Sequence, residues 1–120
     1  MFVLIVHYGT AYACEGKALE LVCTDLVIAD LVSTKSKYPA VMKCSGLDDV
    51  KVLYGEFYWS NEGPFKIKKS KVDKEEGEVL FYLRTRNSGS YKIDGEIHYK
   101  NCQKKRLKTG RITAGYIRAK

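Results

Sequence analysis

This 120-residue chain has little histidine, no long apolar run and none of the short motifs that mark common enzymes. No stretch approaches the roughly 18 consecutive apolar residues of a membrane span, so we expect none. The two histidines, His7 and His98, are too few for a His-based metal cage, so we expect no metal site and no cofactor. Without a Gly-x-Ser-x-Gly motif, a phosphate-binding loop or an acid pair in a catalytic context, we expect no enzyme.

The chain also lacks internal repeats and low-complexity linkers, so residues 14–120 are expected to form one domain. The first 13 residues, MFVLIVHYGTAYA, combine a short apolar core with the small-x-small ending that signal peptidases accept. We therefore expect a signal peptide over 1–13 and a secreted, extracellular product. This leader has no Lys or Arg after Met1 and a short core, which is typical of a truncated leader. The alternative is a buried first strand over Phe2–Val6.

The chain has four cysteines, and both their number and their positions are informative. All four cysteines follow the expected cleavage point, and an even count in a small exported chain predicts two disulfides. No two of them have the two-residue gap of a zinc knuckle or a redox motif, so a four-cysteine zinc site is the less favoured alternative. The cysteines are Cys14, Cys23, Cys44 and Cys102.

Acidic residues are absent from the last part of the chain. The formal net charge is +7, and from Lys100 onwards there are eight Lys or Arg residues and no Asp or Glu. A segment of one sign attracts polyanions, which are sulfated glycans outside a cell or nucleic acid inside one. The alternative is a solvated tail. The residues expected to bind a polyanion are Lys104, Lys105, Arg106 and Lys108.

Hydrophobic periodicity predicts a mainly β protein. Tyr91–Lys100 has the most regular alternation of apolar and polar residues, and Glu78–Arg86 alternates in the same way. Val50–Ser60 is expected to be a long strand that is bent or bulged at Gly55. Shorter strands are expected at Leu19–Cys23, Val41–Cys44 and Phe65–Lys68.

Two further segments are expected to complete the fold. The run LVIADLVS, at 26–33, is apolar enough for a central strand covered on both faces, with a helix over 18–31 as the alternative. Ile112–Ala119 is expected to be a short helix. Several strands separated by turns, with no long amphipathic helix, indicate a small antiparallel barrel or sandwich.

The order of Cys14 after AYA, then Cys23 and TDLVIADLVSTK, resembles the opening of netrin-like domains, the family that includes the tissue inhibitors of metalloproteinases. YKIDGEIHYKNCQ is similar to the late strand and last barrel cysteine of this family, and GRITAGY to its closing helical stretch. The resemblance covers about Cys14 to Tyr116. It implies a five-stranded antiparallel barrel of the oligonucleotide/oligosaccharide-binding type with a short C-terminal helix. It also implies disulfides joining Cys23 to Cys102 and Cys14 to Cys44.

Two shorter likenesses involve only the beginning of the chain. ACEGKALELVC is similar to the first strand of rhamnose-binding lectin domains, and GTAYACEGKALE to the opening of nematode transthyretin-like proteins. The later cysteines and spacing follow neither family, so our expectations for function are based on the netrin-like resemblance.

The netrin-like resemblance implies a protease inhibitor in which Cys14 chelates a catalytic zinc and Glu15 enters the specificity pocket. A carboxylate fits an apolar pocket poorly, and Gly16 stands where the family usually has a cysteine. We therefore expect a secreted, disulfide-stabilised binding protein for an extracellular protein partner, with a metalloprotease as one candidate. The alternatives are a heparin-binding module and, if the leader is retained, an intracellular barrel that binds single-stranded nucleic acid, the least expected partner. The expected contact residues are Cys14, Glu15, Gly16, Ser45, Asp48 and Asp49.

Overall fold

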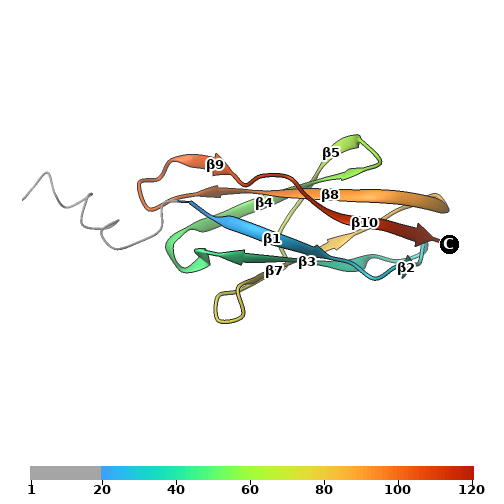
Figure 1. Cartoon of the computed structure of the whole chain (residues 1–120), viewed down its shortest axis with the longest axis horizontal. Coiled ribbons are helices and arrows are strands. Elements are labelled where there is room, and N and C mark those ends of the chain that lie inside the picture. The colour runs from blue at the N-terminus through green and yellow to red at the C-terminus, as the bar shows by residue number, and fades with distance from the viewer. Residues whose placement is uncertain (1–19) are drawn as a thin grey trace, which may run out of the picture.

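The computed structural model describes residues 20–120, which form two β-sheets stacked face to face (Figure 1). The strand order is β1-β3-β7-β6 in sheet A and β2-β10-β8-β4-β5 in sheet B, with β9 also paired to β8. Sheet A consists of β1 (Val22–Val27), β3 (Tyr38–Ser45), β6 (Lys71–Asp73) and β7 (Glu78–Leu83). Sheet B consists of β2 (Leu31–Val32), β4 (Lys51–Trp59), β5 (Glu62–Ile67), β8 (Gly89–Lys100), β9 (Arg106–Lys108) and β10 (Ile112–Ala119).

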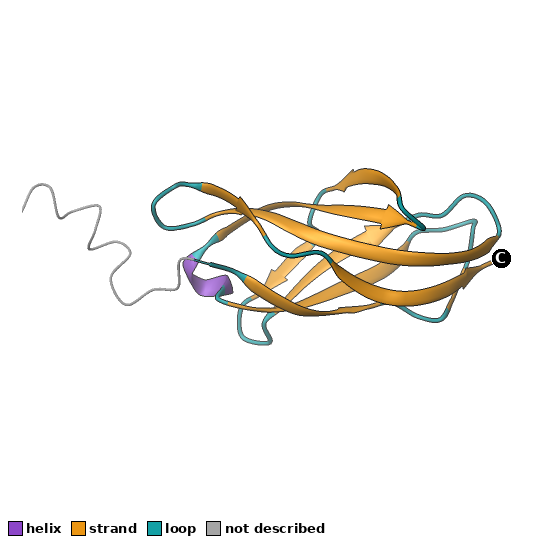
Figure 2. Cartoon of the chain, turned by 45° about the horizontal axis from the view of Figure 1, so that its top comes forward, coloured by secondary structure: helices purple, strands orange, loops and turns teal. Residues whose placement is uncertain are grey.

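Helix is limited, among the described residues, to one 3-10 turn, η1 (Leu47–Asp49), which lies near the start of the described chain in Figure 2. No helix in this part of the chain has the length and apolar character needed to cross a membrane. The expectation of a mainly β protein is therefore confirmed.

The expected closed five-stranded barrel is wrong, because the two sheets remain separate layers. Closure would need a pairing between β1 and β10, which lie beside each other at one side of the molecule without pairing. β10 instead pairs with β8 along its length and with β2 at its end, while β1 pairs only with β3. The fold is thus an open two-layer sandwich, whose inner faces form the core.

The strands with the clearest alternation are confirmed. β7 buries every second side chain, and Val79, Phe81 and Leu83 are completely covered. β8 buries Ile93 and Ile97 in the same way. The strand expected at Val50–Ser60 corresponds to β4, and the strand expected at Val41–Cys44 is part of β3. The strand expected at Phe65–Lys68 overlaps the end of β5.

Gly55 has a different role from the expected bend. β4 is continuous through Gly55, and its register shifts lie elsewhere, between Val52 and Tyr54 on the β8 side and between Phe57 and Trp59 on the β5 side. A Cβ atom on Gly55 would lie only 2.7 Å from the ring of Phe57 and 2.8 Å from the ring of Phe81. These two rings come from opposite sheets and meet edge to face, with centroids 5.0 Å apart. Gly55 therefore leaves room for the central aromatic contact of the core.

The expected C-terminal helix is also wrong, because residues 112–119 form strand β10. This strand runs antiparallel to β8 and gives β8 its second hydrogen-bonded neighbour. Its side chains alternate as strand residues do, with Ile117 and Ala119 buried and Tyr116 exposed. A helix over these residues would leave that edge of β8 unpaired.

The segment 26–33 is neither a central strand nor a helix. Its first residues finish β1, and Leu31 and Val32 form β2, a short strand at the edge of sheet B. Leu26 and Val32 are buried, whereas Val27 and Leu31 are more than half exposed. The segment is thus divided between the two sheets, and each piece buries only one face.

The disulfide pairing implied by the resemblance is wrong for the described cysteines. Cys23 is bonded to Cys44, its direct register partner on the neighbouring strand, with an S–S distance of 2.06 Å. Antiparallel pairing of β1 with β3 brings these two residues together. Cys44 therefore cannot bond to Cys14, and Cys23 cannot bond to Cys102. Cys102 is also disulfide-bonded, and Cys14 lies outside the described residues.

Candidate functional site

The outer face of sheet B gathers polar and aromatic side chains from β4 and β8. Because successive side chains of a strand point to opposite faces, burial of Phe57 and Ile97 turns their neighbours outward. The register of the two strands then sets Glu56 directly opposite Glu96. The outward residues are Tyr54, Glu56 and Tyr58 on β4, and Asp94, Glu96, His98 and Lys100 on β8.

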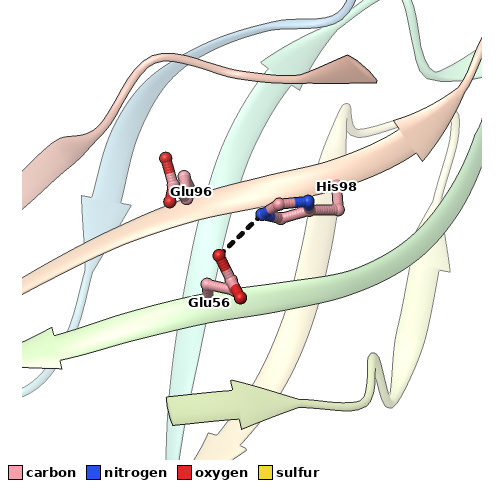
Figure 3. Close-up of side chains that lie close together, drawn as sticks. All are labelled: Glu56, Glu96 and His98. Atoms are coloured by element: carbon pink, nitrogen blue, oxygen red, sulfur yellow. Dashed lines mark hydrogen bonds and ion pairs between the residues drawn. The ribbon is translucent and has the colours of Figure 1, made fainter. Parts of the chain in front are cut away.

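Glu56, Glu96 and His98, which we call the carboxylate–histidine cluster, lie together at the middle of this face (Figure 3). His98 Nε2 is 2.8 Å from Glu56 Oε1, which makes this contact both a hydrogen bond and an ion pair when His98 is protonated. One ligand atom from each of the three side chains lies within 4.8 Å of the other two. Among residues 20–120 this is the group of His, Cys, Asp or Glu side chains that could hold a metal ion.

Tyr58 supports one carboxylate of the cluster. Its hydroxyl donates a hydrogen bond to Glu96 Oε1 at 3.1 Å, and the guanidinium carbon of Arg111 lies 3.6 Å from the centre of its ring. Desolvation, the hydrogen bond to Glu96 and the negative charge of that carboxylate raise the pKa of Tyr58. The phenol therefore stays protonated and remains a donor to Glu96.

Tyr54 supports the histidine of the cluster. Its ring stacks on the His98 imidazole with centroids 4.7 Å apart and planes 12° apart, which fixes the orientation of the imidazole. Lys66 is the register partner of Glu56 on β5, yet its ammonium group lies over the Tyr54 ring, 4.2 Å from the centroid. The two cations beside the cluster, Lys66 and Arg111, therefore lie over aromatic rings.

The acids of β8 are unusually well buried for charged residues on an outer face. Glu96 is 4% exposed and Asp94 is 8% exposed. Asp94 Oδ1 has no hydrogen-bond partner among the described residues. Neither Glu56 nor Glu96 has a Lys or Arg nitrogen of residues 20–120 within 4.0 Å. Negative charge is thus concentrated here, with His98 bonded to Glu56 but no Lys or Arg of the described chain in direct contact with either of these two carboxylates.

Three basic residues occupy the next part of the same face. Lys51 on β4 lies opposite Lys100 on β8, and Lys100 lies opposite Arg106 on β9. We call these three residues the basic row. Within the described chain none of them has a carboxylate oxygen within 4.0 Å. Like charges directly opposite each other destabilise a sheet, so the basic row is not explained by the stability of the fold.

A shallow hollow lies beside the basic row and touches the cluster. Its volume is about 260 Å³, and the ring pair Tyr54 and His98 forms part of its wall. Arg106 and Lys108 contribute positive charge to the same hollow. Its lining residues are Leu53, Tyr54, His98, Arg106, Leu107 and Lys108.

The basic residues expected to bind polyanions lie together in the structure. Lys104 and Lys105 are in the turn between β8 and β9, and Arg106 and Lys108 are on β9. All four side chains are exposed. They form a hairpin at one end of the sandwich, rather than the solvated tail that was the alternative (Figure 1).

The expected protein-contact residues are described only in part. Ser45 ends β3, and Asp48 and Asp49 belong to η1, so these three residues are close in the chain and lie after the disulfide-bonded Cys44. Cys14, Glu15 and Gly16 lie outside the described residues. The bridge expected to hold the two groups together is absent, because Cys44 is bonded to Cys23.

The carboxylate–histidine cluster was not predicted from the sequence. The alternation of β8 does place Glu96 and His98 on one face, but it gives no information on which strand lies beside β8. Glu56 comes from β4, 40 positions before Glu96, and only the pairing register joins them. Comparison with protein-family models, curated proteins and solved structures finds no match. The resemblance to netrin-like domains therefore stays a prediction.

Proposed function

We propose that this protein is a secreted, non-enzymatic binding module that recognises sulfated glycans through the basic row and the β8–β9 hairpin. The observation that carries the proposal is the basic row, in which three cations are register partners on adjacent strands and have no acidic partner among the described residues. An arrangement that weakens the sheet is best explained by an anionic ligand that binds there.

The chemistry of the hollow favours a sugar that carries negative charge. The stacked rings of Tyr54 and His98 form an aromatic part of its wall, and Arg106 and Lys108 lie beside them. An arginine can bind an oxyanion through two parallel N–H groups, as it does with phosphate. A sulfated glycan can therefore place a sugar ring against the aromatic wall and its sulfate groups against the basic side chains.

The disulfide supports a site outside the reducing interior of a cell. Structural disulfides persist mainly in oxidising compartments, and Cys23–Cys44 joins two paired strands of sheet A. This supports a sulfated glycan over an intracellular nucleic acid as the polyanion. A protease partner contacted by Cys14, Glu15 and Gly16 stays a separate prediction, because these residues are not described.

Heparin affinity chromatography with a matched pair of variants tests the proposal. Lys100→Gln/Arg106→Gln removes two members of the basic row. Lys35→Gln/Lys37→Gln removes the same charge from the β2–β3 loop at the opposite end of the molecule (Figure 1). The first variant should elute at clearly lower salt than wild type and the second close to wild type. Equal elution of the two variants would show that net charge alone causes retention and would overturn the proposal.

Parallel titrations with two polyanions distinguish a sulfated glycan from single-stranded nucleic acid. Wild-type protein is titrated with a heparin oligosaccharide and with a single-stranded oligonucleotide of equal charge, at about 0.15 M salt. The glycan should bind more tightly, because the hollow provides only one stacked ring pair. Tighter binding of the oligonucleotide, lost in Tyr54→Ala, would replace the glycan by single-stranded nucleic acid.

A further inference from the structure

We propose that the carboxylate–histidine cluster is a binding site for a divalent transition-metal ion, with Zn²⁺ as the best match. The site goes beyond glycan binding and uses different side chains from the basic row. Its three ligands would be carboxylate oxygens of Glu56 and Glu96 and the Nε2 atom of His98, which already lie within 4.8 Å of one another.

The distances require little movement. Zinc binds nitrogen and oxygen at about 2.0–2.2 Å, so two ligand atoms on one tetrahedral ion lie roughly 3.4 Å apart. His98 Nε2 and Glu56 Oε1 are now 2.8 Å apart, joined by a hydrogen bond that the ion would replace. Figure 3 shows these two side chains turned toward each other, with Glu96 projecting from the same face of β8 as His98. A small rotation of the Glu96 side chain completes the triangle.

The charge of the cluster favours a cation. Glu56 and Glu96 are direct register partners, and like charges in this position destabilise a sheet. Glu96 is 4% exposed, so water screens its charge poorly. Neither carboxylate has a Lys or Arg nitrogen of residues 20–120 within 4.0 Å. A divalent ion between the two carboxylates would turn this repulsion into two attractive contacts.

The surrounding residues would hold the ligands in place. Tyr58 donates a hydrogen bond to Glu96 Oε1, and Tyr54 stacks on the imidazole of His98. Groups that orient metal ligands from the second layer commonly change metal affinity by 10–100-fold. All three ligands also lie on paired strands, which are more rigid than loops.

The ligand types select among metal ions. An imidazole nitrogen suits zinc, copper, iron and nickel, whereas calcium and magnesium prefer sites made only of oxygen. Two carboxylates and one imidazole supply three ligands, so a fourth position on zinc would remain for water or an outside ligand. His98 also forms part of the wall of the hollow, so this ligand is shared by the cluster and the hollow.

A like-charged pair on sheet A provides the control. Glu78 is the register partner of Asp73, and both are half-buried, but this pair belongs to no group of three potential ligands among the described residues. If carboxylates in register were sufficient to bind zinc, this pair would bind it as well. Glu78→Gln therefore distinguishes a built site from general attraction to acids.

The test is calorimetric titration of the full-length, metal-stripped protein with ZnCl₂. Wild type should bind one ion that is lost or weakened more than about 10-fold in His98→Gln and Glu96→Gln, and Tyr58→Phe should weaken it about 10-fold. Glu78→Gln should bind as wild type. Because Glu96 is buried, each variant is checked by circular dichroism, and Glu56→Gln, at a more exposed position, replaces Glu96→Gln if that variant is unfolded.

A second readout locates the ion on the imidazole. The side-chain NMR signals of His98, assigned by their absence in His98→Gln, should shift on addition of one equivalent of ZnCl₂. Wild-type affinity in His98→Gln, unchanged His98 signals, or no binding by the folded wild-type protein would overturn the proposal. Glu96 does not line the hollow, so loss of zinc binding in the folded Glu96→Gln variant with unchanged heparin elution would leave the glycan site intact, and the two proposals can fail separately.

Discussion

The outer faces of the two sheets carry charge in opposite arrangements. On sheet A, Asp25 lies opposite Lys43 and Lys43 opposite Glu78, so charges of opposite sign are neighbours, and only the outermost pair, Glu78 and Asp73, is like-charged. On sheet B, like-charged side chains are register partners at two places, although Glu56 also has the oppositely charged Lys66 as its partner on β5. The like-charged pairs are Lys51 with Lys100, Lys100 with Arg106, and Glu56 with Glu96.

This contrast separates stability from binding. Opposite charges across two strands stabilise a sheet by a few tenths of a kcal/mol, up to about 1 kcal/mol, and like charges destabilise it. Sheet A also carries an outward row of apolar side chains, Val27, Val41 and Leu80, and the Cys23–Cys44 disulfide. We infer that sheet A mainly stabilises the fold, whereas the outer face of sheet B is arranged for ligands.

The largest expected effect comes from removing the disulfide of sheet A. In the chain-entropy account, a bridge across 21 residues contributes about 3 kcal/mol, so Cys23→Ala/Cys44→Ala should lower the free energy of unfolding by about that amount. Urea denaturation of variant and wild type measures the change. Below its unfolding transition the variant should keep wild-type heparin elution. Lost heparin binding by the folded variant would show that the two sheets do not have separate roles.

The next largest effect concerns the shared core, where the two sheets should not differ. Gly55→Ala places a Cβ atom against the rings of Phe57 and Phe81 and should lower the free energy of unfolding by roughly 1–3 kcal/mol. Gly110→Ala is the control, since its added Cβ would meet nothing within 4 Å. Equal stability of the two variants in denaturant titrations would contradict the tight packing around Phe57.

A smaller effect should appear in the core of sheet A at alkaline pH. Burial raises the pKa of Tyr38, whose hydroxyl is hydrogen-bonded to Thr85. Below pH 10 this phenol is neutral in both folded and unfolded chains, so its contribution is complete. As the pH rises above about 10 the unfolded phenol ionises first, and folding stability falls.

Tyr38→Phe should therefore lower the free energy of unfolding by about 1 kcal/mol at neutral pH, because Thr85 loses its partner. The variant should also lose less stability than wild type between neutral pH and pH values above about 10. Tyr116→Phe, at a 70% exposed position, is the control and should follow wild type at every pH. An identical alkaline slope in wild type and Tyr38→Phe would show that Tyr38 does not contribute to it.

The sequence predicts the inner face of the sandwich well and its outer face poorly. Alternation alone identifies β7 and β8, since Phe81 and Ile97 recur at the period of two that burial on one side produces. The C-terminal strand was missed because Ile112, Tyr116 and Ile117 also match a helical spacing. Only the presence of β8 as a pairing partner decides between helix and strand there.

The candidate sites depend on register, which a single sequence does not encode locally. The basic cluster of Lys104, Lys105, Arg106 and Lys108 was predicted because its residues are adjacent in the chain, but the hairpin that carries it was not. The proximity of Glu56 to Glu96 was not predicted, because it depends on how β4 aligns with β8. The Cys23–Cys44 bridge was missed for the same reason, since it follows from the alignment of β1 with β3.

The same substitution on the two sheets tests the contrast most directly. Lys43 and Lys100 each lie between two charged register partners, so Lys43→Glu places three acids side by side, whereas Lys100→Glu inserts an acid between Lys51 and Arg106. In urea denaturation, Lys43→Glu should lower the free energy of unfolding by roughly 0.2–1 kcal/mol for each pair, and Lys100→Glu should raise it by a similar amount. Lys100→Glu should also lose heparin retention. Two variants destabilised equally would contradict the division of roles between the sheets.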